Sequence, residues 1–158
     1  MESMAAACKK SAIMEMEYFL KTLSFVPDGK LTWSPSPTAK SALRIAAHTA
    51  IYAEVFAQII RTGKWFQGDL AEWIAARAAA EEAIKTREEA IALFRKNTDE
   101  VTAALDALTP ELIESTIATP GLSAPMTFFM NLPTLHAQAH AAQIDYLQTC
   151  WGDQEVHL

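Results

Sequence analysis

Three of the four histidines in the chain have a spacing that could build a metal site. His136 and His140 are four residues apart, so on a helix both side chains project from one face, with Cβ atoms about 6 Å apart. His48 falls on the apolar stripe of an earlier predicted helix, which should also face the protein interior. Imidazole is a common nitrogen ligand for zinc, nickel and iron, and three protein ligands leave coordination positions for water or substrate. The pattern therefore predicts that His48, His136 and His140 bind one divalent metal ion.

Ordinary packing is the alternative explanation for the same histidines. A histidine on an apolar stripe can be a hydrogen-bonded core or rim residue, although three of them buried together without a metal would leave donors and acceptors to satisfy. His157 lies in the C-terminal tail and is expected to be solvated rather than a ligand. The identity of the metal stays open, because a three-imidazole site accepts several divalent ions.

No acid or base is evident beside the predicted metal ligands. Zinc peptidases with an H-E-x-x-H motif carry a glutamate base after the first histidine, and alanine holds that position here. Asp145 and Glu54 are spaced so that they point to other helix faces. Gln143, one turn beyond His140, is the best candidate to orient a histidine or a substrate. Hydrolysis is therefore less well supported by the residues, and the lack of any Glu-x-x-His pair excludes a di-iron carboxylate site.

Four amphipathic helices are predicted to position these residues. The first covers residues 3–23, and the second runs from about Ser36-Pro37 to Gly63. The third either begins at Thr86, which forms a capping box with Glu89, or runs on from Asp69. This pattern predicts an all-α protein, a four-helix bundle.

The last predicted helix carries the histidine pair and ends near Trp151, with Gly152 as its stop. Pro133 either kinks its first turns or marks its start near Asn131. A short helix from Pro110 to about Ile117 precedes it, and no alternating run of β-branched residues predicts a sheet. The stripe expected to face inward contains Phe129, Leu132, His136, His140, Gln143, Leu147 and Cys150.

Length and composition exclude several classes of protein. The 158 residues, 51% of them hydrophobic, fit one globular domain over 1–158 and exclude intrinsic disorder. A net charge of −6 argues against a nucleic-acid partner. No window is apolar enough for a membrane span and no signal peptide is evident, so the cytoplasm is the expected compartment. Cys8 and Cys150 are too few and too distant for a disulfide framework or a C-x-x-C motif.

The order of motifs along the chain resembles the DinB-like superfamily of helical bundles. The resemblance is carried by a Trp-containing, Pro-rich segment at 31–37, by 41–48 ending in histidine, and by H-x-x-x-H-x-x-Q at 136–143. It implies that His48, His136 and His140 occupy the family's metal-binding triad. Lys40 and Ala142 depart from residues that are frequent in relatives, which puts in doubt any carry-over of a particular substrate.

The resemblance also implies a topology. The family's bundle has an up-down-down-up order, which requires a long crossover between the second and third helices, and residues 63–85 are long enough to supply it. The first and last helices would then be parallel, and Cys8 and Cys150 would lie at opposite ends, about 30 Å apart.

Two functions are expected from the resemblance and the residues together. The first is a metal-dependent enzyme that activates a small thiol or water for transfer, isomerisation or hydrolysis on a small molecule, since characterised relatives use a metal-bound low-molecular-weight thiol. The second is a non-enzymatic, stress-linked bundle that acts as a binding or dimerisation module, its metal structural or absent. A homodimer is expected from family habit and from the apolar helix surfaces.

Overall fold

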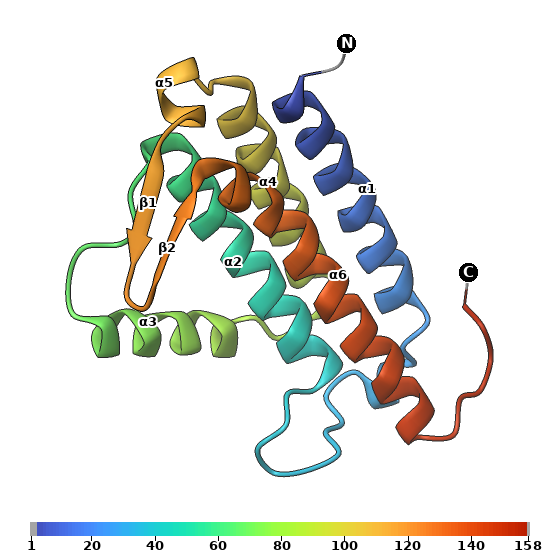
Figure 1. Ribbon diagram of the computed structural model, residues 1–158. Helices are drawn as coiled ribbons and strands as arrows, with labels where there is room; N and C mark the ends of the chain where they lie inside the picture. Colours follow the sequence, from blue (N-terminus) through green and yellow to red (C-terminus); the bar gives the residue numbers. More distant parts are fainter. Residues whose placement is uncertain (1–2, 158) are drawn as a thin grey trace.

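The computed structural model describes residues 3–157. Four long helices form a bundle (Figure 1): α1 (Met4–Ser24), α2 (Ala42–Thr62), α4 (Arg87–Asp106) and α6 (Met126–Cys150). Shorter elements connect them: a 3₁₀ turn (Asp28–Lys30), α3 (Leu70–Ala83), α5 (Pro110–Ile113) and the strands β1 (Thr116–Thr119) and β2 (Leu122–Pro125).

The bundle has the up-down-down-up order. Helices α1 and α2 lie diagonally opposite each other in the bundle, and each packs against both α4 and α6. Contacts of Arg61 with Glu100 and of Asn97 with the Ala50 carbonyl show that α2 and α4 are parallel. The Sγ atom of Cys8, near the start of α1, lies 3.6 Å from Oδ1 of Asn131, near the start of α6, so these two helices are parallel as well. The predicted topology is confirmed, with the crossover between α2 and α4 containing α3 (Figure 1).

Capping residues explain where two of the helices begin. Thr86 and Glu89 form the expected capping box, and Ile84 is extended before it, so α3 and α4 are separate helices. The predicted start of the second helix near Ser36-Pro37 is wrong. Ser41 caps α2 by accepting from the Arg44 amide, because the preceding loop is turned by the Ser34 hydroxyl.

The region before the histidine pair differs from the prediction in two ways. Helix α6 runs from Met126 through Pro133, so a start near Asn131 is wrong. The expected absence of a sheet is also wrong, because β1 and β2 form an antiparallel hairpin with Ile117 opposite Ala124. Each strand has only four residues, too few for their alternation to be read from sequence. The short helix α5 ends at Ile113, before the predicted end near Ile117, because Ile117 belongs to β1.

The buried face of α6 is offset from the predicted stripe. Ala137, Ala141 and Ile144 are fully buried, whereas Gln143 and Cys150 are exposed. His136 and His140 therefore lie at the edge of the buried face, toward α2, and not on the bundle axis. Within residues 3–157, no helix is both long and apolar enough to cross a membrane.

Candidate metal centre

The structure brings the three predicted histidines together between α2 and α6. Each of His48, His136 and His140 offers a ring nitrogen, and these nitrogens all lie within 4.8 Å of one another. The ring centroid of His48 is 5.1 Å from that of His136 and 4.8 Å from that of His140. Nitrogens this close can be ligands of a single ion.

The two histidines of α6 face each other directly. Their Nε2 atoms are 3.1 Å apart, as the four-residue spacing allows on one helix face. Two imidazolium ions at this distance would repel each other, whereas two neutral rings can direct lone pairs toward one cation.

Hydrogen bonds on the outer side orient two of the three rings. His48 Nδ1 lies 2.6 Å from Glu81 Oε1, and His140 Nδ1 lies 2.7 Å from Gln143 Oε1. A carboxylate or amide oxygen only accepts, so in a neutral ring the proton is on Nδ1 and the Nε2 lone pair is left for a metal. Gln143 thus contacts a histidine, as expected for a residue that orients a ligand.

Electrostatics keep the α6 histidines unprotonated. Burial, reinforced by the charges of His140 and His48, lowers the pKa of His136 to about 3. Burial likewise lowers the pKa of His140, although its bond to Gln143 opposes the shift. Metal ligation requires neutral imidazole, so these residues fit a divalent cation at neutral pH without first releasing protons.

Glu81 is the residue that sequence reasoning missed. It is the only buried residue of α3, and its carboxylate bonds both His48 and Lys40. Burial alone would raise the pKa of this carboxyl, but the bonds from Lys40 and His48 outweigh burial and lower it. Glu54 and Asp145 are exposed, as their spacing suggested.

A signal for Glu81 was present on the other helix. Arg44 and His48 are four residues apart on one side of α2, and Lys40 lies four residues before Arg44, just ahead of the helix. Such a row needs a carboxylate opposite it, yet nothing in the sequence shows which acidic residue of the crossover supplies it.

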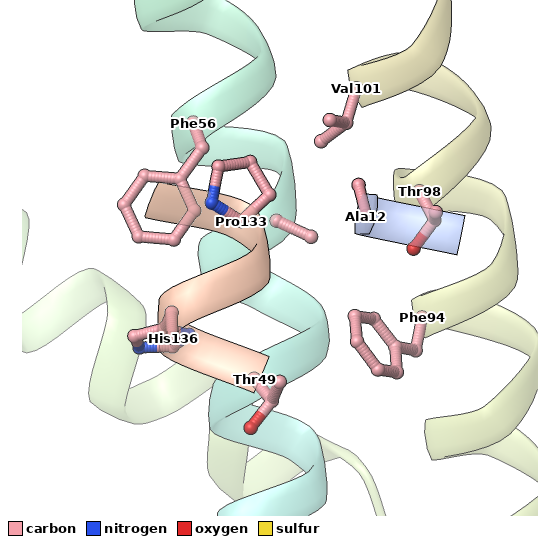
Figure 2. Close-up of a pocket in the computed structure, with 9 residues that line it drawn as sticks. Ala12, Thr49, Phe56, Phe94, Thr98, Val101, Pro133 and His136 are labelled. Carbon is pink, nitrogen blue, oxygen red and sulfur yellow. The ribbon is translucent and has the colours of Figure 1, made fainter. Parts of the chain in front are cut away.

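Aromatic rings cover the inner side of the centre. Tyr52 lies 4.3 Å from the His48 ring and 5.5 Å from the His136 ring, and Phe56 packs edge-on against His136 at 5.2 Å. Figure 2 shows a cavity behind His136, between Phe56 and Pro133 on one side and residues of α4 on the other. Its volume is about 10 Å³, room for no more than one water molecule, so it cannot admit a substrate.

An open groove of about 560 Å³ lies on the other side, next to His140 and Gln143. Its walls are mostly apolar and come from the loop before α2 and from both helices: Pro35, Ala39, Lys40, Ile45, Ala139, Ala142, Tyr146 and Leu147. Lys40 and Ala142, which the sequence analysis singled out as departures from the family pattern, both line this groove.

His157 is not part of the centre, as expected, but its predicted solvation is wrong. Its ring stacks on Phe25 at 4.3 Å and its Nε2 contacts Asp153, which leaves 13% of the side chain exposed. The C-terminal tail thus folds back onto the end of α1, a long-range contact that no local sequence pattern predicts.

Solved structures of low sequence identity share this fold. YfiT from Bacillus subtilis, described as a probable metal-dependent hydrolase with an unusual four-helix bundle topology, superposes with a TM-score of 0.73 at 14% identity, covering 94% of this chain and 87% of its own. A DinB-like protein from Bacillus subtilis gives a TM-score of 0.68 at 16% identity over 96% of both chains. A mycothiol-dependent maleylpyruvate isomerase gives 0.68 at 13% identity, with 89% of this chain and 60% of that chain covered.

Sequence comparison identifies the family. No curated protein matches the chain. The family model of the DinB superfamily matches residues 12–144, which include all three histidines of the centre and each of the four bundle helices in whole or in large part. The chain therefore belongs to the DinB superfamily.

Proposed function

We propose that this chain is a metal-dependent enzyme that acts on a small molecule, with His48, His136 and His140 as the metal ligands. The observation that carries the proposal is the convergence of three imidazole nitrogens within 4.8 Å beside an open groove. The metal-dependent hydrolase and the thiol-dependent isomerase among the structural neighbours support it.

The chain's own residues would prepare the centre. Glu81 and Gln143 hold the Nδ1 protons of two ligand rings, so that Nε2 of each faces inward. Tyr52 and Phe56 exclude water from the inner side, and the groove leaves His140 open to a ligand. A divalent ion bound there would lower the pKa of a coordinated water or thiol and so supply a nucleophile at neutral pH.

A small thiol is the first candidate for the activated group. Transfer or isomerisation through a thiol needs no neighbouring base when a metal ionises the sulfur. Glu81, the one buried carboxylate found at the centre among residues 3–157, already accepts from Lys40 and His48 and is not free to take a proton from water. Hydrolysis is the second candidate and is favoured by the description of YfiT.

The competing proposal is a binding or dimerisation module without catalysis. Exposed apolar side chains on α1 and α6, among them Met14, Tyr18, Leu135 and Tyr146, are compatible with a homodimer. A homodimer and a cytoplasmic location both stay predictions.

Metal analysis of purified protein tests the proposal. The wild-type chain should carry about one equivalent of divalent metal, and His136→Ala should carry far less because one of three ligands is lost. His157→Ala is the matched control, since it removes a histidine that lies outside the centre. Equal metal content in the wild type and His136→Ala would remove the proposed site.

Catalysis is tested with the metal-loaded protein. Conjugation of common low-molecular-weight thiols to an electrophile should be accelerated by the wild type and lost in His136→Ala. A metal-loaded protein that accelerates neither conjugation nor ester hydrolysis would favour the binding module.

A further inference from the structure

The crossover helix α3 is attached to the bundle in an unusual way. Its only buried residue is Glu81, so the helix has no apolar stripe of its own fully buried against the bundle. It packs chiefly on α2 and lies beside it, below the hairpin (Figure 1). Trp73, near its start, packs against Tyr52 and Trp65.

The last turn of α3 is fixed by charged groups from the start of α2. The Arg44 guanidinium donates to the carbonyls of Glu81, in the last turn, and of the C-cap residue Ile84, and the Glu81 carbonyl also accepts from the Ile84 amide. Lys40 and His48 bond the two oxygens of the Glu81 carboxylate. One of these three bonding partners is a predicted metal ligand, so the end of α3 and the metal centre share a residue.

We propose that Glu81 is the positioning residue of His48, and that through it metal binding is coupled to the docking of α3. The inference rests on the proposed metal site. A docked α3 holds the His48 proton on Nδ1 and the ring in place, which favours ligation through Nε2. By thermodynamic reciprocity, a metal that fixes His48 must stabilise the docked position of α3 by the same factor.

The chain offers a matched pair of carboxylates for the test. Glu82 adjoins Glu81, but its side chain is 70% exposed and only approaches Arg44, at 3.8 Å. In Glu81→Gln one carboxylate oxygen is replaced by an NH₂ donor, so Lys40 and His48 no longer each have an acceptor oxygen of their own. Glu82→Gln removes an equal charge from the same turn without touching a histidine.

Cobalt titration measures the positioning role. Co²⁺ binding, followed by its visible absorption, should be about 10- to 100-fold weaker in Glu81→Gln than in the wild type. Glu82→Gln should bind like the wild type. Equal affinity of Glu81→Gln and the wild type would overturn this inference alone, whereas no binding by the wild type would overturn the proposed function with it.

Two further measurements do not depend on the variant's affinity. In metal-free, ¹⁵N-labelled wild type, the His48 ring should show the Nδ1–H tautomer, and Glu81→Gln should lose it while Glu82→Gln keeps it.

In the wild type alone, added Co²⁺ should slow amide hydrogen exchange in the last turn of α3 by about 5-fold or more. An Nε2–H tautomer in the wild type, or exchange unchanged by bound Co²⁺, would contradict the coupling.

Discussion

His136 is a neutral imidazole held in a place where its protonated form is unfavourable. Burial and the two neighbouring histidines lower its pKa from 6.5 to about 3. In the metal-free protein this environment affects the free energy of unfolding, because His136 is solvated in the unfolded chain and takes up a proton there at an ordinary pKa.

The metal-free protein should therefore lose stability as the pH falls. Between about pH 6.5 and 3 the unfolded state binds a proton at His136 that the folded state does not, so the free energy of unfolding decreases toward acid pH. Chemical denaturation in the presence of a chelator, at a series of pH values, measures this slope. His136→Asn should flatten it, and an identical slope in both proteins would contradict the assigned pKa shift.

At this scale the sequence predicted the three histidines that the structure brings together, but not the carboxylate that bonds His48. The four-residue spacing of His136 and His140 has a direct consequence on any helix, and the apolar stripe of the second helix placed His48 opposite them. Glu81 and Lys40 meet only because the last turn of α3 packs beside the start of α2, and no local pattern encodes that contact. The half-buried position of the histidines also depends on how α2 and α6 pack.

At the start of α4, a complete capping box bonds backbone amides that have no partner within the helix. The Thr86 side chain accepts from the Glu89 amide at 3.1 Å, and the Glu89 carboxylate accepts from the Lys85 and Thr86 amides. Arg87 then donates to the Leu23 and Val26 carbonyls, which ties this end of α4 to the end of α1. Residues 85–89 thus cap the start of α4 and, through Arg87, also bond carbonyls at the end of α1.

Removal of the cap should have a measurable cost. Thr86→Ala is expected to lower the free energy of unfolding by about 1 kcal/mol, since it leaves the Glu89 amide without its side-chain acceptor. Thr102→Ala in the same helix is the control and should stay within about 0.5 kcal/mol, because its hydroxyl only donates to the Asp99 carbonyl within the helix. Urea unfolding measures the free energy of unfolding of both variants, and an equal decrease in the two would argue against the capping box.

The long periodic helices and the capped short helix α5 were predictable from the sequence. The capping box at Thr86 was one of two starts that the sequence left open for α4, and the structure selects it. Helix α3 and the hairpin lack the apolar stripe or the length that pattern reasoning requires. The second helix begins five residues later than predicted from Ser36, because two serines near its start can each act as a cap and only Ser41 does so.

For the whole molecule, the parallel arrangement of α1 and α6 separates the two cysteines. Cys8 is buried beside Asn131 and burial raises the pKa of its thiol, while Cys150 is exposed at the far end of α6. A thiol reagent should therefore modify Cys150 in the native protein and Cys8 only after unfolding. Peptide mapping after brief labelling checks this, and an internal disulfide formed on mild oxidation would be incompatible with the topology.

The same arrangement affects how the chain can be assembled during synthesis. Helix α1 is synthesised well before α6, one of its two partners, and the contact between Cys8 and Asn131 spans 123 positions. Non-local contacts of this kind slow folding relative to a bundle of successive hairpins. The apolar side of α1 therefore stays partly uncovered in the nascent chain until α6 has been made, and during that interval it is exposed to aggregation.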